Sequence, residues 1–195
     1  MFKFLERTSG SYMPLWGHVR DNVIMLDDGS KFAMVAVMGC PWETADARDV
    51  VDKHLRWNHT LKNIASPNLI MMVYQCRGLA DSGIYPAGKF RSDFAASLDA
   101  AYRAKLFEQS LYENRTFIGI QLRPERYAGE TVSEHLALHQ TPVNDPDEER
   151  IQRLEEVIAL LMAELKTYRP RRLGVRTRGH CVFSEMAEAL VLAMT

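Results

Sequence analysis

The chain has 195 residues, 47% of them hydrophobic, which is enough to build a buried core in one large domain or two small ones. It carries 24 basic and 25 acidic residues, so its overall charge attracts neither nucleic acid nor a membrane surface. Three cysteines, Cys40, Cys76 and Cys181, are far apart and form no C-x-x-C pair, which argues against a disulfide framework and a structural zinc site. This cysteine usage fits a reducing compartment.

The sequence predicts no membrane span. The longest uncharged apolar stretch, Phe32–Trp42, is about eleven residues long and contains Gly39 and Pro41, whereas a spanning helix needs about 20 apolar residues. Residues 1–10 mix charges of both signs without a long apolar core, so we expect no signal peptide.

The first predicted elements are a hairpin and a helix. Residues 21–27 and 31–38 are strand-like runs joined through Asp28-Gly29, a dipeptide that suits a tight turn. From Thr44 the apolar residues recur at helical spacing until Ser66-Pro67 stops the pattern, which predicts a helix.

The middle of the chain predicts strand, helix and strand. Leu69–Cys76 is a continuous apolar run, which indicates a strand covered on both faces near the centre of a sheet. Ser92 is expected to cap a helix that reaches Leu111 and Tyr112, and Thr116–Leu122 is the next strand. The residues that repeat every four positions in this helix are Phe94, Leu98, Tyr102 and Leu106.

The last third begins with a polar segment, residues 125–144, which predicts a long loop with a short helical turn around 133–139. Asp145-Pro146-Asp147-Glu148 then has the capping acid and early proline of a helix start. Leu173–Thr177 is predicted as a strand, and Phe183–Met194 as a final helix capped by Ser184. The core stripe of the preceding helix is expected to be Ile151, Leu154, Ile158, Leu161 and Leu165, widened by Val157 and Leu160; a partner-binding seam is the alternative.

These elements predict an α+β fold, with a mixed, largely antiparallel sheet flanked by about four helices.

One segment is similar to a phosphate-binding loop. Gly83–Phe90 reads G-I-Y-P-A-G-K-F, one residue short of G-x-x-x-x-G-K-[ST], so Gly83, Gly88 and Lys89 are its candidate nucleotide-binding residues. Phe90 stands where the motif needs a hydroxyl for Mg²⁺, and Pro86 removes a backbone donor. We therefore interpret the segment as a surface loop that leads into a helix, with a nucleotide site as the alternative.

Other candidate sites are incomplete. His135 and His139 are spaced to share a helix face, as zinc ligands can be, but no third ligand is indicated and a solvated loop is the simpler interpretation. No nucleophile elbow or catalytic constellation is recognisable, so the sequence leaves enzymatic activity open.

A basic stretch runs from Lys166 to Arg178. Its cations could meet anionic lipid, an acidic partner or nucleic acid, or could be a solvated strand edge. Arg171, Arg172 and Arg176 are our candidate partner-binding residues here, and Trp16 and Trp42 are candidate anchors, with Trp57 as a third tryptophan whose exposure the sequence does not fix.

Five segments in a consistent order carry a resemblance to a known family. They are Y-M-P-L-W-G-H-V-R-D-N-V-I-M-L-D-D-G-S at Tyr12–Ser30, M-G-C-P-W-E-T at Met38–Thr44, Y-P-A-G-K-F-R-S-D-F-A-A-S-L-D-A-A-Y at Tyr85–Tyr102, L-Y-E-N-R-T-F-I at Leu111–Ile118 and F-S-E-M-A-E-A-L at Phe183–Leu190. With them the chain resembles, over nearly its whole length, the N-terminal region of the VirB/TrbE/CagE-type ATPases of bacterial type IV secretion and conjugation systems.

The resemblance implies a non-catalytic docking and assembly domain on the cytoplasmic face of the inner membrane, peripheral to it. Its expected partners are the inner-membrane components of the secretion channel and sister subunits, and we expect none among nucleic acids. No catalytic residue, metal or cofactor is implied for this chain. ATP and Mg²⁺ are implied for a motor domain that we expect to follow Thr195 in a longer protein. The alternatives left open are a small nucleotide-binding enzyme using Gly83–Phe90 and a DNA-binding module using Arg169–Arg178.

Overall fold

A computed structural model describes residues 14–40, 45–80, 83, 85, 88–108, 110–124 and 147–194. The contacts divide the chain into two compact units. The first contains the described residues up to Tyr74 and from Thr116 onward, and the second is the segment between them, Gln75–Arg115.

Three N-terminal strands of the first unit form two successive antiparallel hairpins: β1 (Leu15–Arg20), β2 (Val23–Leu26) and β3 (Lys31–Val37). In the second turn the Leu26 N–H donates to the Ser30 carbonyl at 2.9 Å, and Gly29 has a φ of 76°, which residues with a side chain rarely adopt. The hairpin predicted through Asp28-Gly29 is confirmed. The strand β1 is an additional element that the sequence pattern did not predict.

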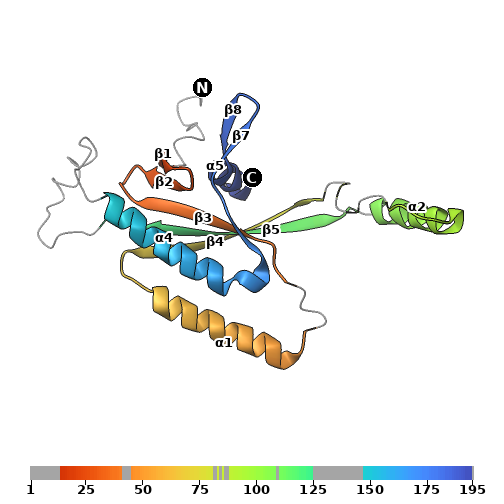
Figure 1. The fold of residues 1–195 in the computed structure, drawn as a ribbon, viewed down its shortest axis with the longest axis horizontal. Coiled ribbons are helices and arrows are strands. Elements are labelled where there is room, and N and C mark those ends of the chain that lie inside the picture. The colour runs from red at the N-terminus through yellow and green to blue at the C-terminus, as the bar shows by residue number, and fades with distance from the viewer. Residues whose placement is uncertain are drawn as a thin grey trace, which may run out of the picture. The chain divides into compact units, whose positions relative to one another are not determined.

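Strand β3 is the centre of the sheet (Figure 1). It pairs along its whole length with β5 (Tyr112–Leu122), from Lys31 opposite Leu122 to Val37 opposite Thr116. On its other edge it pairs with β2 and with the short strand β6 (Pro170–Arg172). These pairs are antiparallel and the strand order is β1-β2-β3-β5-β4, so the predicted α+β fold with a largely antiparallel sheet is confirmed.

Strand β4 (Leu69–Leu79) lies at the edge of this sheet, so its predicted central position is wrong. Leu69 and Met71 pack against the core on one face, while Val73 is 53% exposed. On the neighbouring strand, a Cβ added to Gly119 would lie 3.3 Å from the ring of Tyr74. The run is apolar because part of each face is covered, and a continuous apolar run does not reveal whether both edges are paired.

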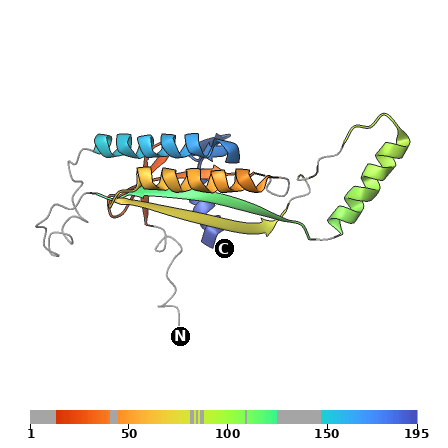
Figure 2. The ribbon, with the colours of Figure 1, turned by 90° about the horizontal axis from the view of Figure 1, so that it is seen from below.

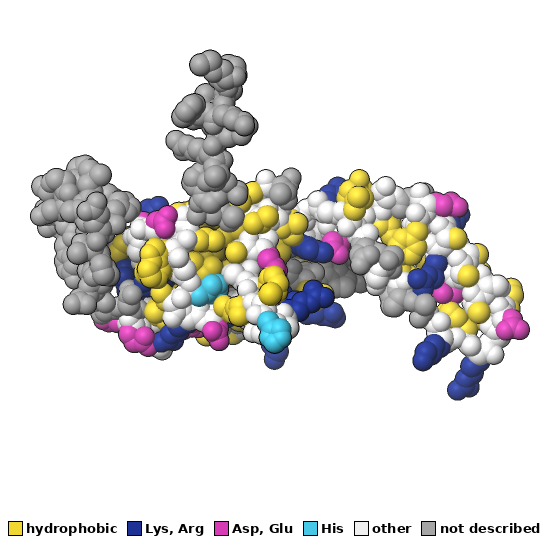
Figure 3. Space-filling view, turned by 90° about the horizontal axis from the view of Figure 1, so that it is seen from above, with side chains coloured by type: hydrophobic (Ala, Val, Ile, Leu, Met, Phe, Trp, Pro, Cys, Tyr) yellow, Lys and Arg dark blue, Asp and Glu magenta, His cyan; other side chains and the backbone are white. Residues whose placement is uncertain are grey.

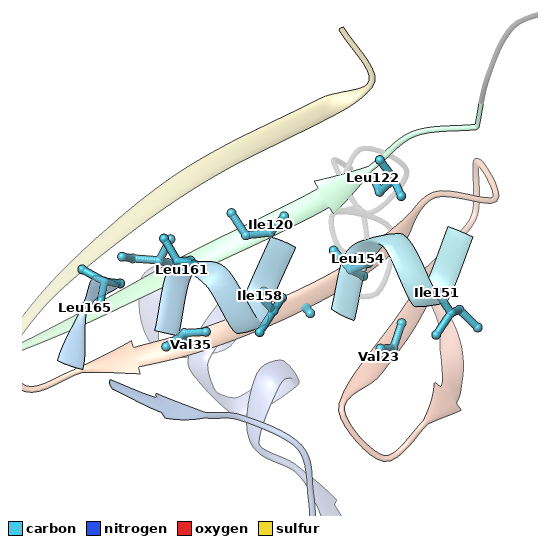
Figure 4. Packing of buried hydrophobic residues seen from close by; sticks show 11 residues of the cluster. Val23, Val35, Ile120, Leu122, Ile151, Leu154, Ile158, Leu161 and Leu165 are labelled. Atoms are coloured by element: carbon cyan, nitrogen blue, oxygen red, sulfur yellow. The ribbon is translucent and has the colours of Figure 1, made fainter. Parts of the chain in front are cut away.

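Helix α4 (Asp147–Glu164) closes the core over β3 and β5. Figure 4 shows Leu154, Ile158 and Leu161 directed from the helix toward strand residues that include Val35 and Ile120. The predicted stripe is confirmed as core, because its members are all nearly inaccessible: Ile151 4% exposed, Leu154 0%, Ile158 1%, Leu161 0% and Leu165 5%.

Helix α1 (Ala47–Ile64) lies beside α4 on the same face of the sheet (Figure 2). Its last turn is anchored by Ile64, which is 7% exposed, and Trp57 packs against the core from the middle of the helix. The helix predicted to end before Ser66-Pro67 is confirmed.

The C-terminal segment adds β6 to the sheet and ends in a helix on the face opposite α1 and α4 (Figure 2). After a short 3-10 helix, η4 (Lys166–Tyr168), and β6, the strands β7 (Val175–Arg178) and β8 (Cys181–Ser184) form a hairpin that leads into α5 (Glu185–Met194). The Leu173 N–H donates to the Met34 carbonyl at 3.0 Å, and the Val175 N–H to the Asp21 carbonyl at 2.8 Å. These bonds fasten the hairpin to the main sheet.

The prediction for this segment had one wrong strand boundary and one correct helix cap. The strand predicted over Leu173–Thr177 is present as β7 but begins two residues later, at Val175, because Leu173 and Gly174 separate it from β6; a Cβ on Gly174 would lie 3.0 Å from the Asp21 carbonyl oxygen. The predicted cap of the last helix is confirmed, since the Ala187 N–H donates to Ser184 Oγ at 3.2 Å.

The second unit contains helix α2 (Asp93–Phe107) and the ends of β4 and β5. The predicted cap is confirmed, because the Ala95 N–H donates to Ser92 Oγ at 3.2 Å. The expectation that this helix reaches Tyr112 is wrong. Tyr112 begins β5, where the Arg77 guanidinium lies 4.6 Å from its ring centroid, so cross-strand packing replaces the last helical turn.

The predicted loop over 125–144, with His135 and His139, and the candidate anchor Trp42 lie outside the described residues.

Candidate interaction surfaces

Trp16 is a large apolar side chain at the surface. It lies on β1, the outer strand of the sheet, and is 68% exposed. On the same strand His18 Nε2 and Ser184 Oγ are 2.8 Å apart, which connects β1 to the cap of α5. Trp57 is instead packed against the core, so of these two tryptophans only Trp16 is available to a partner in this structure.

Glu185, the first residue of α5, accepts hydrogen bonds from two arginines of the basic stretch. Arg171 Nη1 donates to both of its carboxylate oxygens at 2.9 Å, and Arg176 Nη2 also donates to it. The Gly174 N–H adds a backbone bond at 3.2 Å. Burial alone would raise the pKa of Glu185, but the Arg171, Gly174 and Arg176 hydrogen bonds and the Arg171 charge together hold it below its usual range.

Arg172 points the other way, toward α4. It pairs with Glu155 through two nitrogens, and Arg172 Nη2 is 2.8 Å from Glu155 Oε1. Both side chains are less than a quarter exposed. This half-buried pair joins β6 to the helix that covers the core.

The three candidate arginines therefore do different things. Arg172 forms a half-buried ion pair that connects β6 to α4. The side chains of Arg171 and Arg176 form ion pairs with Glu185 but are still 56% and 63% exposed. Spacing alone placed them in one basic stretch and could not reveal acids on α4 and α5 as their partners. Their binding to a partner stays a prediction.

Helix α2 presents bulky apolar side chains to solvent. Phe94 is 77% exposed, Leu98 60% and Tyr102 54%, and the helix has no buried residue among those described. Figure 3 shows hydrophobic and basic side chains side by side on this helix. The sequence indicated the four-residue repeat but not its exposure, because the same spacing is typical of a core-facing stripe.

The side of α2 next to this stripe, which includes the Tyr102 ring, contacts the segment before the helix. Tyr85 donates to Asp99 Oδ1 at 3.1 Å, and its ring centroid is 5.7 Å from that of Tyr102. The hydrogen bond to Asp99, together with partial burial and the Asp99 charge, raises the pKa of Tyr85. The hydroxyl therefore stays a donor across the physiological pH range.

The candidate phosphate-binding residues lie in this second unit. Lys89 precedes the helix cap Ser92, so it does not stand at the start of the helix as the motif requires. The Phe90 ring covers Gly88, because a Cβ there would lie 2.4 Å from the Phe90 Cζ atom. Gly83 is exposed.

The described residues offer neither a metal site nor a membrane-spanning helix. Among these residues, no three His, Cys, Asp or Glu side chains are grouped so that they could hold a metal ion. None of the described helices combines the length and apolar character that crossing a bilayer requires. An open depression near the end of α4 is lined by Arg56, Ala163, Glu164, Lys166 and Thr167.

Comparison with known proteins gives consistent matches. A family described as "Type IV secretion system ATPase VirB4/TrbE, N-terminal domain" matches residues 22–129. The Type IV secretion system protein virB4 of Bartonella henselae is 32% identical over 188 residues, which are 95% of this chain and 24% of that protein. Protein virB4 of Agrobacterium fabrum is 32% identical over 190 residues, or 97% of this chain and 24% of that protein. The chain thus spans about a quarter of the length of these relatives.

Proposed function

Since this chain belongs to the family of VirB4/TrbE type IV secretion ATPases and corresponds to its N-terminal domain, we propose that it is a non-catalytic docking and assembly domain. It would bind inner-membrane components of the secretion channel and sister subunits, from the cytoplasmic face of the membrane. The observation that carries the proposal is the exposure of Trp16, 68%, on the outer strand of a folded family member.

An exposed tryptophan favours a binding role for a physical reason. Tryptophan is enriched among the few residues that contribute most to protein interfaces, because it buries a large apolar area with few rotatable bonds. Exposed Arg176 lies on the C-terminal hairpin and exposed Arg171 on β6 before it, and His18 connects β1 to that hairpin. Apolar and basic groups carried by connected strands are suited to a protein partner with an apolar pocket and acidic rim.

Co-purification tests this role. The tagged chain is produced together with the inner-membrane components of its own secretion system, and captured components are quantified against a Trp16→Ala variant. We expect at least tenfold weaker capture, which corresponds to a loss of about 1.4 kcal/mol or more for a central anchor. Met38→Ala is the matched control, because Met38 is an equally accessible apolar side chain, 80% exposed, at another place. Undiminished capture by Trp16→Ala, with unchanged thermal unfolding, would refute the Trp16 site.

We also propose that this chain binds no nucleotide and that the ATP and Mg²⁺ implied by the family are bound elsewhere in the longer protein. The support is local: Phe90 replaces the metal-binding hydroxyl and its ring covers Gly88, while Lys89 stands before the helix cap. Calorimetric titration with Mg-ATP should give no heat of binding. Micromolar binding that Lys89→Ala removes would instead establish the enzyme alternative.

The DNA-binding alternative depends on free cations between Arg169 and Arg178. Arg171, Arg172 and Arg176 are engaged by carboxylates of the same chain, while Arg169 and Arg178 are exposed, so this alternative would have to rely mainly on these two. Retention on DNA at low salt that falls steeply as salt rises would support this alternative, and we expect no retention.

A further inference from the structure

Helix α2 has an unusual composition for an exposed helix. Its bulky apolar residues Phe94, Leu98 and Tyr102 are each more than half exposed. The face opposite to them carries Ala96, Ala100 and Ala104 together with Asp93 and Phe107, all of them exposed, so it is only weakly charged. Such a helix gains stability when a second surface covers its bulky face.

Charged residues of opposite sign lie at the two ends of the bulky face of α2. At 100° per residue, Phe94, Leu98, Ala101 and Lys105 share one face of the helix, and the same face continues to Glu108, the C-cap residue. Arg91 lies just before the N-cap, at the opposite end. Both Arg91 and Glu108 are exposed, so the apolar stripe has a cation at its N-terminal end and an anion at its C-terminal end.

This pattern is complementary to itself when a second copy is turned end for end. With the two-fold axis between Leu98 and Ala101, Leu98 of one copy packs against Ala101 of the other, and the stem of Lys105 crosses the ring of Phe94. Arg91 then meets Glu108 of the second copy, twice in the dimer. A parallel arrangement would instead put Arg91 beside Arg91 and Lys105 beside Lys105.

We propose that α2 is a self-association surface through which two copies of this chain pair with antiparallel helices. A lipid surface fits less well, because the anion Glu108 lies on the same face as Phe94 and Leu98, which would have to enter the lipid. The proposal rests on the assembly role proposed above and gives the contact between sister subunits a location.

Sedimentation analysis of the whole chain over a range of concentrations tests the surface. We expect a monomer–dimer equilibrium that Leu98→Asp weakens by more than tenfold, because it buries a carboxylate at the two-fold axis. Ala100→Asp is the matched control on the opposite face and should leave the equilibrium unchanged. Neither variant touches a buried residue of α2, so circular dichroism should show both folded. A wild-type chain that stays monomeric at about 100 µM, or a dimer that Leu98→Asp does not weaken, would overturn the proposal.

Charge exchange tests the antiparallel register. Arg91→Glu and Glu108→Arg, each alone, place like charges together twice in the dimer and should weaken it by roughly three- to tenfold, the scale of two exposed ion pairs. The double variant should restore wild-type association. A double variant as weak as the single ones would refute this register.

These experiments distinguish failure of the α2 self-association surface from failure of the proposed docking role. A dimer formed through another face would remove only the α2 proposal, whereas the docking role fails only when the chain captures no channel component.

Discussion

Replacing Glu185 with Gln should loosen the C-terminal hairpin from α5. The side chain keeps its size and can still accept from the Gly174 N–H, but it loses the charge that Arg171 and Arg176 share. Glu185 also begins α5, where a negative charge is stabilised by the positive end of the helix dipole. The substitution therefore removes two ion pairs and one favourable dipole interaction without opening a cavity.

The expected loss of unfolding free energy is moderate. The carboxylate is only 13% exposed, but both arginine side chains are more than half exposed, so solvent screens each pair. Pairs of this kind contribute about 0.5–1 kcal/mol each, and the dipole adds a few tenths. We expect Glu185→Gln to lower the free energy of unfolding by about 1–2 kcal/mol at pH 7.

The difference should depend on pH with a definite sign. Because the arginines lower the pKa of Glu185 in the folded chain below its ordinary value of 4.5, the folded state favours the carboxylate. Its contribution is complete above the pKa of the unfolded chain and disappears as the pH falls through the folded pKa. The wild type and Glu185→Gln should therefore converge in acid.

Urea unfolding at pH 7 and at pH 3 measures both effects. Glu188→Gln is the control, since Glu188 is an exposed acid on the same helix, and it should change the unfolding free energy by less than about 0.5 kcal/mol. A Glu185→Gln variant as stable as the wild type at pH 7, or one equally destabilised at both pH values, would refute the reasoning.

Two further substitutions test the packing around the sheet. Ile158→Ala, at a 1% exposed position between α4 and the sheet, should lower the free energy of unfolding by about 2–5 kcal/mol in a urea titration, while Leu160→Ala on the 40% exposed side of α4 should change it little. Gly119→Ala should lower the free energy of unfolding by about 1–3 kcal/mol, because the new Cβ would lie 2.8 Å from the buried ring of Phe32. Adding Phe32→Leu to this variant should recover part of the loss. A Gly119→Ala variant as stable as the wild type would contradict the close approach of Phe32 to Gly119.

Local sequence patterns predicted turns, helix caps and a core-facing helix stripe in the two units. The Asp28-Gly29 turn, the caps Ser92 and Ser184, and the stripe from Ile151 to Leu165 all act over a few residues, so spacing is sufficient to recognise them. The resemblance carried by five short segments also identified the family, which the comparison with the N-terminal domain confirms.

Position within the sheet could not be read in the same way. The apolar run of β4 was predicted to lie centrally, yet it forms an edge, because its neighbours are chosen by residues far away in the chain. Lys31 is the opposite case: it is a charged residue with 0% exposure, placed inside by its pairing with Leu122 on β5. Side-chain character alone predicts neither outcome.

The sequence by itself determined the Asp28-Gly29 turn, the caps of α2 and α5, the residues that form the α4 core stripe, and the family to which the chain belongs. Tertiary structure alone decided that Trp16 is exposed while Trp57 is packed, that Arg172 turns inward while Arg171 and Arg176 hold Glu185, and that the repeat on α2 faces solvent. The physical reason is the range of the interactions: caps, turns and helical periodicity depend on neighbours along the chain, whereas burial and ion pairing depend on which distant elements come together.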